Sequence, residues 1–231
     1  MISFFSRLLD LLSPRSCAVC HRRLTISERM MCCTCILHLP RTHFARKPYD
    51  NEMAQRFWGL LPVERVAALF YYHPHSDESR LIYALKYGNR PDYGWQIGRL
   101  TASEMMDEGF FEGIDVIVPM PITKSRRHER GYNQCEEFAR GIAELTAIPI
   151  ATDVVERHSF GISQTKLNHW DRRENVKNVF HLTNGEPISN RHVLLVDDIM
   201  TTGSTIISCA SELLKAGNVK ISILTIGFTE G

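Results

Sequence analysis

The sequence lacks an excess of charge, internal repeats and low-complexity tracts. Its 27 Lys and Arg residues nearly balance 26 Asp and Glu residues, which leaves a formal net charge of +1. This balance excludes the global basic field that is typical of nucleic-acid and membrane-surface binders. The absence of repeats excludes a solenoid. Any contact with an anionic partner must therefore be local.

The sequence also lacks a long uninterrupted apolar run. Its apolar beginning, "MISFFSRLLDLLSP", is interrupted by Arg7 and Asp10 and ended by Pro14. This stretch is too short to span a bilayer and carries no small-residue cleavage site, so it predicts a short amphipathic helix. We expect a cytoplasmic protein without a membrane span. Its seven cysteines are then metal ligands or buried residues rather than disulfides.

Five of the cysteines crowd together near the N-terminus. Two C-x2-C pairs, "CAVC" and "CCTC", are separated by eleven residues, and such pairs suit tetrahedral zinc because each short turn brings two thiolates to one side. A unit of about 40 residues cannot fold on apolar burial alone, so we expect a structural zinc module within residues 1–45. The expected ligands are Cys17, Cys20, Cys32 and Cys35. The alternative ligands are Cys33, His21 and His38, and the alternative to zinc is a redox-active or metal-free thiol cluster.

The rest of the chain alternates between apolar strands and amphipathic helices. With 231 residues, 44% of them hydrophobic, it can bury one sizeable core. Residues 41–51 are polar and lack periodicity, which predicts a linker. Periodicity then predicts strands over 64–72, 114–121, 192–197 and 219–228, and helices over 76–88, 91–109, 133–147 and 204–216. This alternation indicates an α/β fold, with a mostly parallel, twisted sheet and helices on both faces.

One strand runs directly into an unusual polar turn, "HVLLVDDIMTTGST" in residues 192–205. Ligands of such sheets bind at the carboxyl ends of the strands, where Asp197 and Asp198 are expected. The hydroxyls and N–H groups of Thr201 to Thr205 suit a phosphate, and Gly203 permits a tight turn. The carboxylates suit sugar hydroxyls, or a magnesium ion that bridges the sugar to a second phosphate. The alternative, an ordinary helix cap, needs only one such residue, whereas seven of the nine positions from Asp197 to Thr205 are acidic, hydroxylic or glycine.

The stretch "VLLVDDIMTTGST" resembles the phosphoribosyl pyrophosphate (PRPP) binding motif of type I phosphoribosyltransferases. Together with the cysteine pairs, "ALKYGNRP", "VPMPITKSRRHERGYNQ" and "QTKLNHWDRRENVKNVF", it makes residues 8–228 resemble the ComF family. The resemblance implies a type I phosphoribosyltransferase fold over residues 50–231, after a double-zinc-ribbon-like module. It also implies that Asp197 and Asp198 hold the ribose hydroxyls of magnesium-bound PRPP. The residues implied to cradle the 5′-phosphate are Thr201, Thr202, Gly203, Ser204 and Thr205.

A basic segment, "ITKSRRHERGYNQ", follows the second buried strand. In similar enzymes this position holds the pyrophosphate loop, where a diphosphate needs fixed positive charge and N–H donors. The candidate ligands are Arg126, Arg127, Arg130 and Gln134. Lys124 and His128 add to the same positive segment, and a solvated basic turn is the alternative. Cys135, which follows it, is expected to be a buried helix residue rather than a nucleophile.

The resemblance implies a role in the site for two further segments. Residues 159–180 lie where type I enzymes carry a flexible hood that closes over the substrate, and the candidate ligands there are Lys166 and Arg173. Alternatively, the role of Arg173 is structural. Trp170 either packs against this segment or stacks on a base. In "ALKYG", Lys86 either complements a helix dipole or belongs to the site.

The leading interpretation is a PRPP-binding, magnesium-dependent protein, with structural zinc, linked to DNA uptake or nucleotide metabolism. If it is an enzyme, the reaction displaces pyrophosphate from the ribose, and the acceptor stays open. The alternative, which follows from the association of the ComF family with natural competence, is a noncatalytic factor for single-stranded DNA that stacks bases on Trp58, Tyr132 or Trp170. Its partners would be PRPP or a related sugar phosphate, single-stranded DNA, or proteins of the competence machinery. A third reading is an inactive interaction platform, against which the presence of both carboxylates argues.

Overall fold

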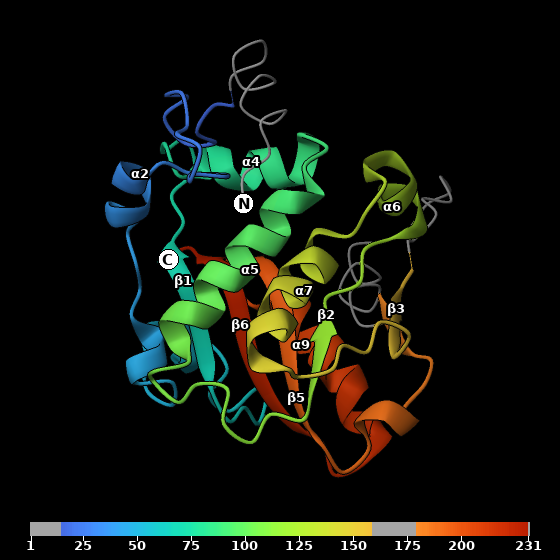
Figure 1. Ribbon diagram of the computed structural model, residues 1–231. Coiled ribbons are helices and arrows are strands. Elements are labelled where there is room, and N and C mark those ends of the chain that lie inside the picture. Colours follow the sequence, from blue (N-terminus) through green and yellow to red (C-terminus); the bar gives the residue numbers. More distant parts are fainter. Residues whose placement is uncertain (1–14, 159–178, 231) are drawn as a thin grey trace, which may run out of the picture.

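A parallel four-stranded sheet forms the centre of the molecule (Figure 1), whose computed structural model describes residues 15–158 and 179–230. The strands lie in the order β1 (Val66–Tyr71), β6 (Lys220–Phe228), β5 (His192–Met200) and β2 (Val116–Pro119). All three pairings are parallel. A separate antiparallel pair consists of β3 (Val155–Arg157) and β4 (Phe180–Leu182). The predicted α/β fold with a mostly parallel sheet is confirmed.

Helices cover both faces of this sheet. In Figure 1, α5 and α7 lie in front of the sheet and α9 lies behind it. The α-helices are α2 (Cys33–Leu37), α3 (Glu52–Gln55), α4 (Ser79–Tyr87), α5 (Pro91–Met105), α6 (Lys124–Arg130), α7 (Gln134–Thr146) and α9 (Ser204–Leu213). Short 3₁₀ helices span Phe44–Arg46, Glu186–Ile188 and Leu214–Ala216. Because both faces are covered, β5 can be apolar without alternation, and Val193 to Val196 are fully buried.

The contact between α5 and α7 depends on two glycines. A Cβ atom on Gly98 would lie 2.2 Å from the carbonyl oxygen of Phe138, and one on Gly141 would lie 2.1 Å from the carbonyl oxygen of Trp95. The two helices can therefore approach at backbone distance only because neither position carries a side chain. The contact with α5 therefore fixes the position of α7, whose first residue is Gln134.

The segment over residues 41–51 is packed, so the prediction of a linker is wrong. Phe44 is buried, and its ring contacts Tyr71 and Phe228 with centroids 5.6 and 5.7 Å away. Arg41 donates from Nε to Glu104 Oε2 over 2.7 Å. The polar composition of this segment conceals buried side chains, which tie the cysteine-bearing unit to the core. The proposed division into residues 1–45 and 50–231 stays a prediction.

The other differences concern the ends of elements. The strand predicted over 192–197 continues to Met200, so the two aspartates lie inside β5, near its carboxyl end. The basic segment contains α6, because the Thr123 side chain accepts the N–H of Arg126 and caps a helix there. The helix predicted within residues 1–14 lies outside the described residues. Within 15–158 and 179–230, no helix is long and apolar enough to cross a membrane.

Candidate functional site

The two aspartates of β5 lie in a buried cluster. Both side chains are less than a tenth exposed. Asp198 Oδ2 lies 2.8 Å from the amide Nε2 of Gln134 and 3.1 Å from the ammonium Nζ of Lys86, and its Oδ1 accepts the N–H of Ile199. Asp197 Oδ1 accepts the N–H of Asp198 and lies 3.5 Å from the Sγ of Cys135. The structure thus brings Gln134 to the carboxylates, as a direct neighbour of the expected ribose site.

The environment of Asp197 disfavours its negative charge. Burial, followed by the charge of Asp198, raises the pKa of Asp197 from 3.8 to about 7. Burial also raises the pKa of the Cys135 thiol, which keeps this group neutral and able to donate to the carboxylate. Cys135 is buried, as expected for a helix residue that packs in the core. Hydrogen-bonding partners that favour the anion of Asp197, such as ligand hydroxyls, would therefore have a large effect here.

The pKa of Asp197 leads to a prediction on stability. Since its pKa in the folded state is above its ordinary value, the stability contributed by Asp197 is complete below about pH 4 and is lost as the pH rises through about 7. The Asp197→Asn variant cannot ionise, so its free energy of unfolding should fall less than that of the wild type between pH 5 and 8, by up to about 1.4 kcal/mol per pH unit. Urea unfolding at several pH values measures this difference. An Asp107→Asn variant, altered at an exposed acid, should follow the wild type, and parallel curves for Asp197→Asn and the wild type would contradict the assignment.

The turn after β5 presents donors at the start of α9. Gly203 has φ +80° and lies just before the helix, in a conformation that favours glycine. A Cβ there would also lie 2.9 Å from Met200 Cε. Within the described residues, the N–H groups of Gly203, Thr205 and Ile206 have no acceptor, and the hydroxyls of Thr202 and Ser204 lie 3.1 Å apart. Free N–H groups and hydroxyls at a helix N-terminus are suited to an anion.

The basic segment contributes unequally to this end of the sheet. Arg127 makes a two-point ion pair with Glu136, with N–O distances of 2.6 and 3.0 Å, so its charge is already compensated. Arg130 instead donates to Gln134 Oε1 over 3.0 Å, and its guanidinium lies 5.2 Å from the centre of the Tyr87 ring. Arg126 lies on α6, where its side chain is exposed. Of the predicted pyrophosphate ligands, Gln134 therefore contacts Asp198 directly and Arg130 is linked to Asp198 through Gln134, whereas Arg127 pairs with Glu136 instead.

A cavity of about 470 Å³ lies between the end of α4 and α6. Its lining includes Lys86, Tyr87, His128 and Arg130, with Glu129 as the one acidic side chain among the described lining residues. Lys86 belongs both to this cavity and to the cluster around Asp198. The cavity is therefore a positively charged space next to the buried carboxylates.

Sequence reasoning missed Arg157 on β3. Burial, followed by the positive charge of Arg126, lowers the pKa of Arg157, while Asp197 acts in the opposite sense. The guanidinium lies 5.3 Å from the centre of the Phe180 ring and has no ion pair within the described part of the chain. Arg157 lies opposite Phe180 in the β3–β4 pair, and this pairing joins residues that are distant in the sequence. The short "VVERH" stretch offered no motif that could have selected it.

Comparison with known proteins matches this arrangement. A family model for the phosphoribosyl transferase domain matches residues 134–228. The DNA utilization protein YhgH of Escherichia coli K12 is 28% identical over 215 residues, which are 90% of this chain and 87% of that protein. Competence protein F of Haemophilus influenzae is 34% identical over 110 residues, or 47% and 48% of the two chains. These similarities support the resemblance of this chain to the ComF family and to type I phosphoribosyltransferases.

Among solved structures, the chain is similar to the glutamine PRPP amidotransferase of Bacillus subtilis, complexed with ADP and GMP. That protein is 20% identical, with a TM-score of 0.39, and the match covers 56% of this chain and 25% of the amidotransferase.

The N-terminal unit of the chain gathers four thiols. Their sulfur atoms lie within 4.8 Å of one another, and the cysteines are Cys17, Cys20, Cys32 and Cys35. The Sγ atoms of Cys20 and Cys32 are 3.8 Å apart, which is about the edge of a tetrahedron with metal–sulfur bonds of about 2.3 Å. Although burial acts in the opposite sense, hydrogen bonds from Cys35 and neighbouring thiols lower the pKa of Cys32 to about 7. This set can hold a metal ion, and it does not include Cys33, His21 or His38.

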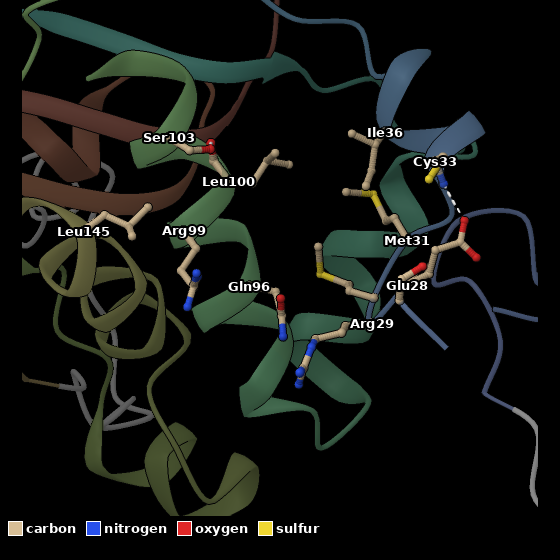
Figure 2. A pocket seen from close by; sticks show the side chains of 12 residues that line it. Glu28, Arg29, Met31, Cys33, Ile36, Gln96, Arg99, Leu100, Ser103 and Leu145 are labelled. Atoms are coloured by element: carbon tan, nitrogen blue, oxygen red, sulfur yellow. Dashed lines mark hydrogen bonds between the residues drawn. The ribbon is translucent and has the colours of Figure 1, made fainter. Parts of the chain in front are cut away.

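A second cavity, of about 450 Å³, separates the cysteine-bearing unit from α5 (Figure 2). Met31, Ile36 and Leu100 line it with apolar groups. Two of its charged groups already have partners: Glu28 accepts the N–H of Cys33 over 2.7 Å, and Arg99 pairs with Glu144 over 2.5 Å. We therefore place the functional site at the carboxylates of β5. The hood candidates Lys166 and Arg173 lie outside the described residues.

Proposed function

We propose that this protein binds PRPP with magnesium at the carboxyl ends of β5 and β2. The observation that carries the proposal is the pair of buried carboxylates followed directly by a turn whose N–H groups have no acceptor within the described residues. Asp197 and Asp198 would accept the ribose hydroxyls, and the 5′-phosphate would bind the N–H groups and hydroxyls of Thr201 to Thr205. This order matches the order of the groups along the ligand.

The diphosphate of the ligand would lie near positively charged side chains. The diphosphate would lie toward Arg130 and Gln134, with Arg126 and Arg127 farther along α6, and magnesium would neutralise its remaining charge. Lys166 and Arg173 stay predicted contributors to the same site. The reaction that such a ligand supports is transfer of the phosphoribosyl group with release of pyrophosphate, for which these residues would position groups and stabilise charge.

We also propose that Cys17, Cys20, Cys32 and Cys35 hold one structural zinc ion. Four sulfur donors in a closed set are the donors that structural zinc prefers. Among the described residues of this unit, 15–45, no acid–base group contacts the carboxylates of β5, so its proposed role is to form part of the scaffold. A cytoplasmic location fits reduced thiols in this cluster.

The melting temperature tests PRPP binding. A ligand that binds only the folded state stabilises it by about 2.7 kcal/mol at a concentration of 100 times its Kd, which for a chain of this size raises the melting temperature by roughly 5–10 °C. We expect this rise with PRPP and magnesium, and a much smaller one with ribose 5-phosphate and magnesium. Magnesium alone is the control. The absence of any shift at millimolar PRPP would overturn the proposal.

A second candidate function is the binding of single-stranded DNA. Tyr83 and Tyr87 are 68% and 59% exposed on α4, with ring centroids 4.8 Å apart, and Arg130 lies over Tyr87. Exposed rings beside a cation are the groups on which unpaired bases stack. The relatives named DNA utilization protein and Competence protein F favour the same partner. The rings predicted from the sequence were Trp58, Tyr132 and Trp170. Tyr132 is buried, and Trp170 lies outside the described residues, so Tyr83 and Tyr87 form a different surface.

An oligonucleotide arm of the thermal experiment separates the two functions. An oligo-dT that stacks on this surface should raise the melting temperature at low salt, and a Tyr83→Ala/Tyr87→Ala variant should lose the effect. Tyr49→Ala, altered at a similarly exposed ring (63%) on another segment, is the matched control. DNA binding should weaken steeply with salt. A melting temperature that rises with PRPP but does not change with the oligonucleotide would exclude this second function.

A further inference from the structure

Lys86 contacts the buried carboxylate of Asp198 and also lines the neighbouring positively charged cavity. It lies in the last turn of α4, and its Nζ is 3.1 Å from Asp198 Oδ2. The same side chain lines the positively charged cavity that contains His128 and Arg130. Its ammonium is therefore held by a carboxylate 112 positions away in the sequence, and a role limited to the dipole of its own helix does not account for this contact.

The hydrogen bonds of Asp198 leave little room for a ligand. Its Oδ2 receives both Lys86 and the amide of Gln134, and its Oδ1 receives the N–H of Ile199. A carboxylate oxygen has two acceptor positions, so Oδ2 is fully used. A ribose hydroxyl that approaches Oδ2 must displace one of these two donors. Gln134 is fixed from its other side by Arg130, whereas the Lys86 side chain is long and partly exposed, at 23%.

The cavity offers Lys86 a second position. It holds about 470 Å³ and brings the side chains of His128 and Arg130 near the lysine. Lys86 and Arg130 carry like charges, and Glu129 is the one acidic side chain among the described lining residues, so an anion in this cavity would be attracted by both cations. A diphosphate is an anion of high charge, and it would attract the flexible ammonium away from Asp198.

We infer that Lys86 is a specificity-determining residue that couples binding of the diphosphate to binding of the ribose. When the diphosphate enters the cavity, Lys86 turns to it and leaves Asp198 Oδ2 to accept a ribose hydroxyl. Ribose 5-phosphate alone must displace Lys86 into water, and pyrophosphate alone leaves Asp198 without its cation. Only a ligand that carries both parts compensates both charges. This inference rests on the proposed binding of PRPP.

The test compares three ligands, each with magnesium, on four proteins by calorimetric titration. For the wild type we expect PRPP to bind far more tightly than ribose 5-phosphate or pyrophosphate. Lys86→Gln should weaken PRPP and pyrophosphate at least tenfold, yet leave ribose 5-phosphate unchanged or bound more tightly, because its competitor for Asp198 is gone. Lys86→Arg, which keeps the charge, should recover part of the preference for PRPP. Lys220→Gln, altered at an exposed lysine at the other end of β6, should leave all three affinities unchanged.

The outcomes separate this inference from the function on which it rests. A wild type that binds no PRPP overturns both. If the wild type binds PRPP but Lys86→Gln weakens PRPP and ribose 5-phosphate by the same factor, only the role of Lys86 fails, since a general loss of positive field or of structure produces that result. Circular dichroism of the Lys86→Gln protein, with a melting curve, separates a loss of structure from a loss of field.

Discussion

Replacing Cys32 with Ser is expected to remove bound zinc and to lower the melting temperature sharply, whereas replacing its neighbour Cys33 with Ser should do neither. The two residues are adjacent in sequence, but only Cys32 is buried and belongs to the four-thiol cluster. Cys33 is exposed, and its N–H is held by Glu28. The pair therefore gives a matched comparison of one substitution at two neighbouring positions.

The effect should be large because metal binding and folding are coupled in small units of this kind. Structural zinc contributes roughly 10 kcal/mol or more of binding free energy in zinc-finger peptides, and a unit of about 40 residues cannot fold on apolar burial alone. Arg80 donates to the carbonyl of Val19, and Arg41 pairs with Glu104, so loosening this unit also affects α4 and α5. Elemental analysis under reducing conditions, followed by melting curves with and without a chelator, measures both parts.

The expected ratio is one zinc ion per chain in the wild type and in Cys33→Ser. Zinc retained at full occupancy in Cys32→Ser would mean that Cys33 is the ligand. Absence of zinc from the wild type under reducing conditions would contradict the proposed zinc site altogether.

Replacing Gly98 with Ala is expected to destabilise the protein although alanine favours helices. The intrinsic gain is about 1 kcal/mol, but the new Cβ would lie 2.2 Å from the carbonyl oxygen of Phe138. Since the neighbouring atoms belong to the backbone of α7, the two helices must separate, and overpacking of this kind costs about 1–3 kcal/mol or more. The net effect should be a loss of stability.

The separation should also reach the functional site. The first turn of α7 carries Gln134 and Cys135, which contact the two aspartates, so PRPP binding should weaken together with stability. Denaturant unfolding and ligand titration measure the two effects. Ser103→Ala, altered at an exposed position of the same helix, is the control and should be neutral or slightly stabilising. Equal stability of Gly98→Ala and Ser103→Ala would show that α5 and α7 do not require this close approach.

The features that the sequence predicted well are those that local pattern determines. Continuous apolar runs predicted β5 and β6 because a strand covered on both faces needs no alternation. The helix expected over 133–147 agrees with α7, since Asn133 caps it and Ala147 ends it. Once the strands were known to be parallel, the rule for their carboxyl ends placed Asp197 and Asp198 beside the basic segment.

The features that escaped prediction depend on contacts between distant residues. The ion pair of Arg127 with Glu136 compensates the charge of one expected ligand, and no local pattern distinguishes Arg127 from Arg130. Phe44 is buried by Tyr71 and Phe228, although its neighbours in sequence are polar. Arg157 packs against Phe180 in a strand pair whose members are separated by more than twenty residues.

The most direct test of the central claim is calorimetric titration of PRPP with magnesium into the Asp197→Asn/Asp198→Asn protein. These substitutions keep the shape of both side chains but remove charge-assisted hydrogen bonds worth about 1.5–3 kcal/mol each. We expect one binding site in the wild type, an affinity at least tenfold lower in the double variant, and the wild-type affinity in Asp107→Asn. Equal affinity of the double variant and the wild type would contradict the placement of the ribose at β5.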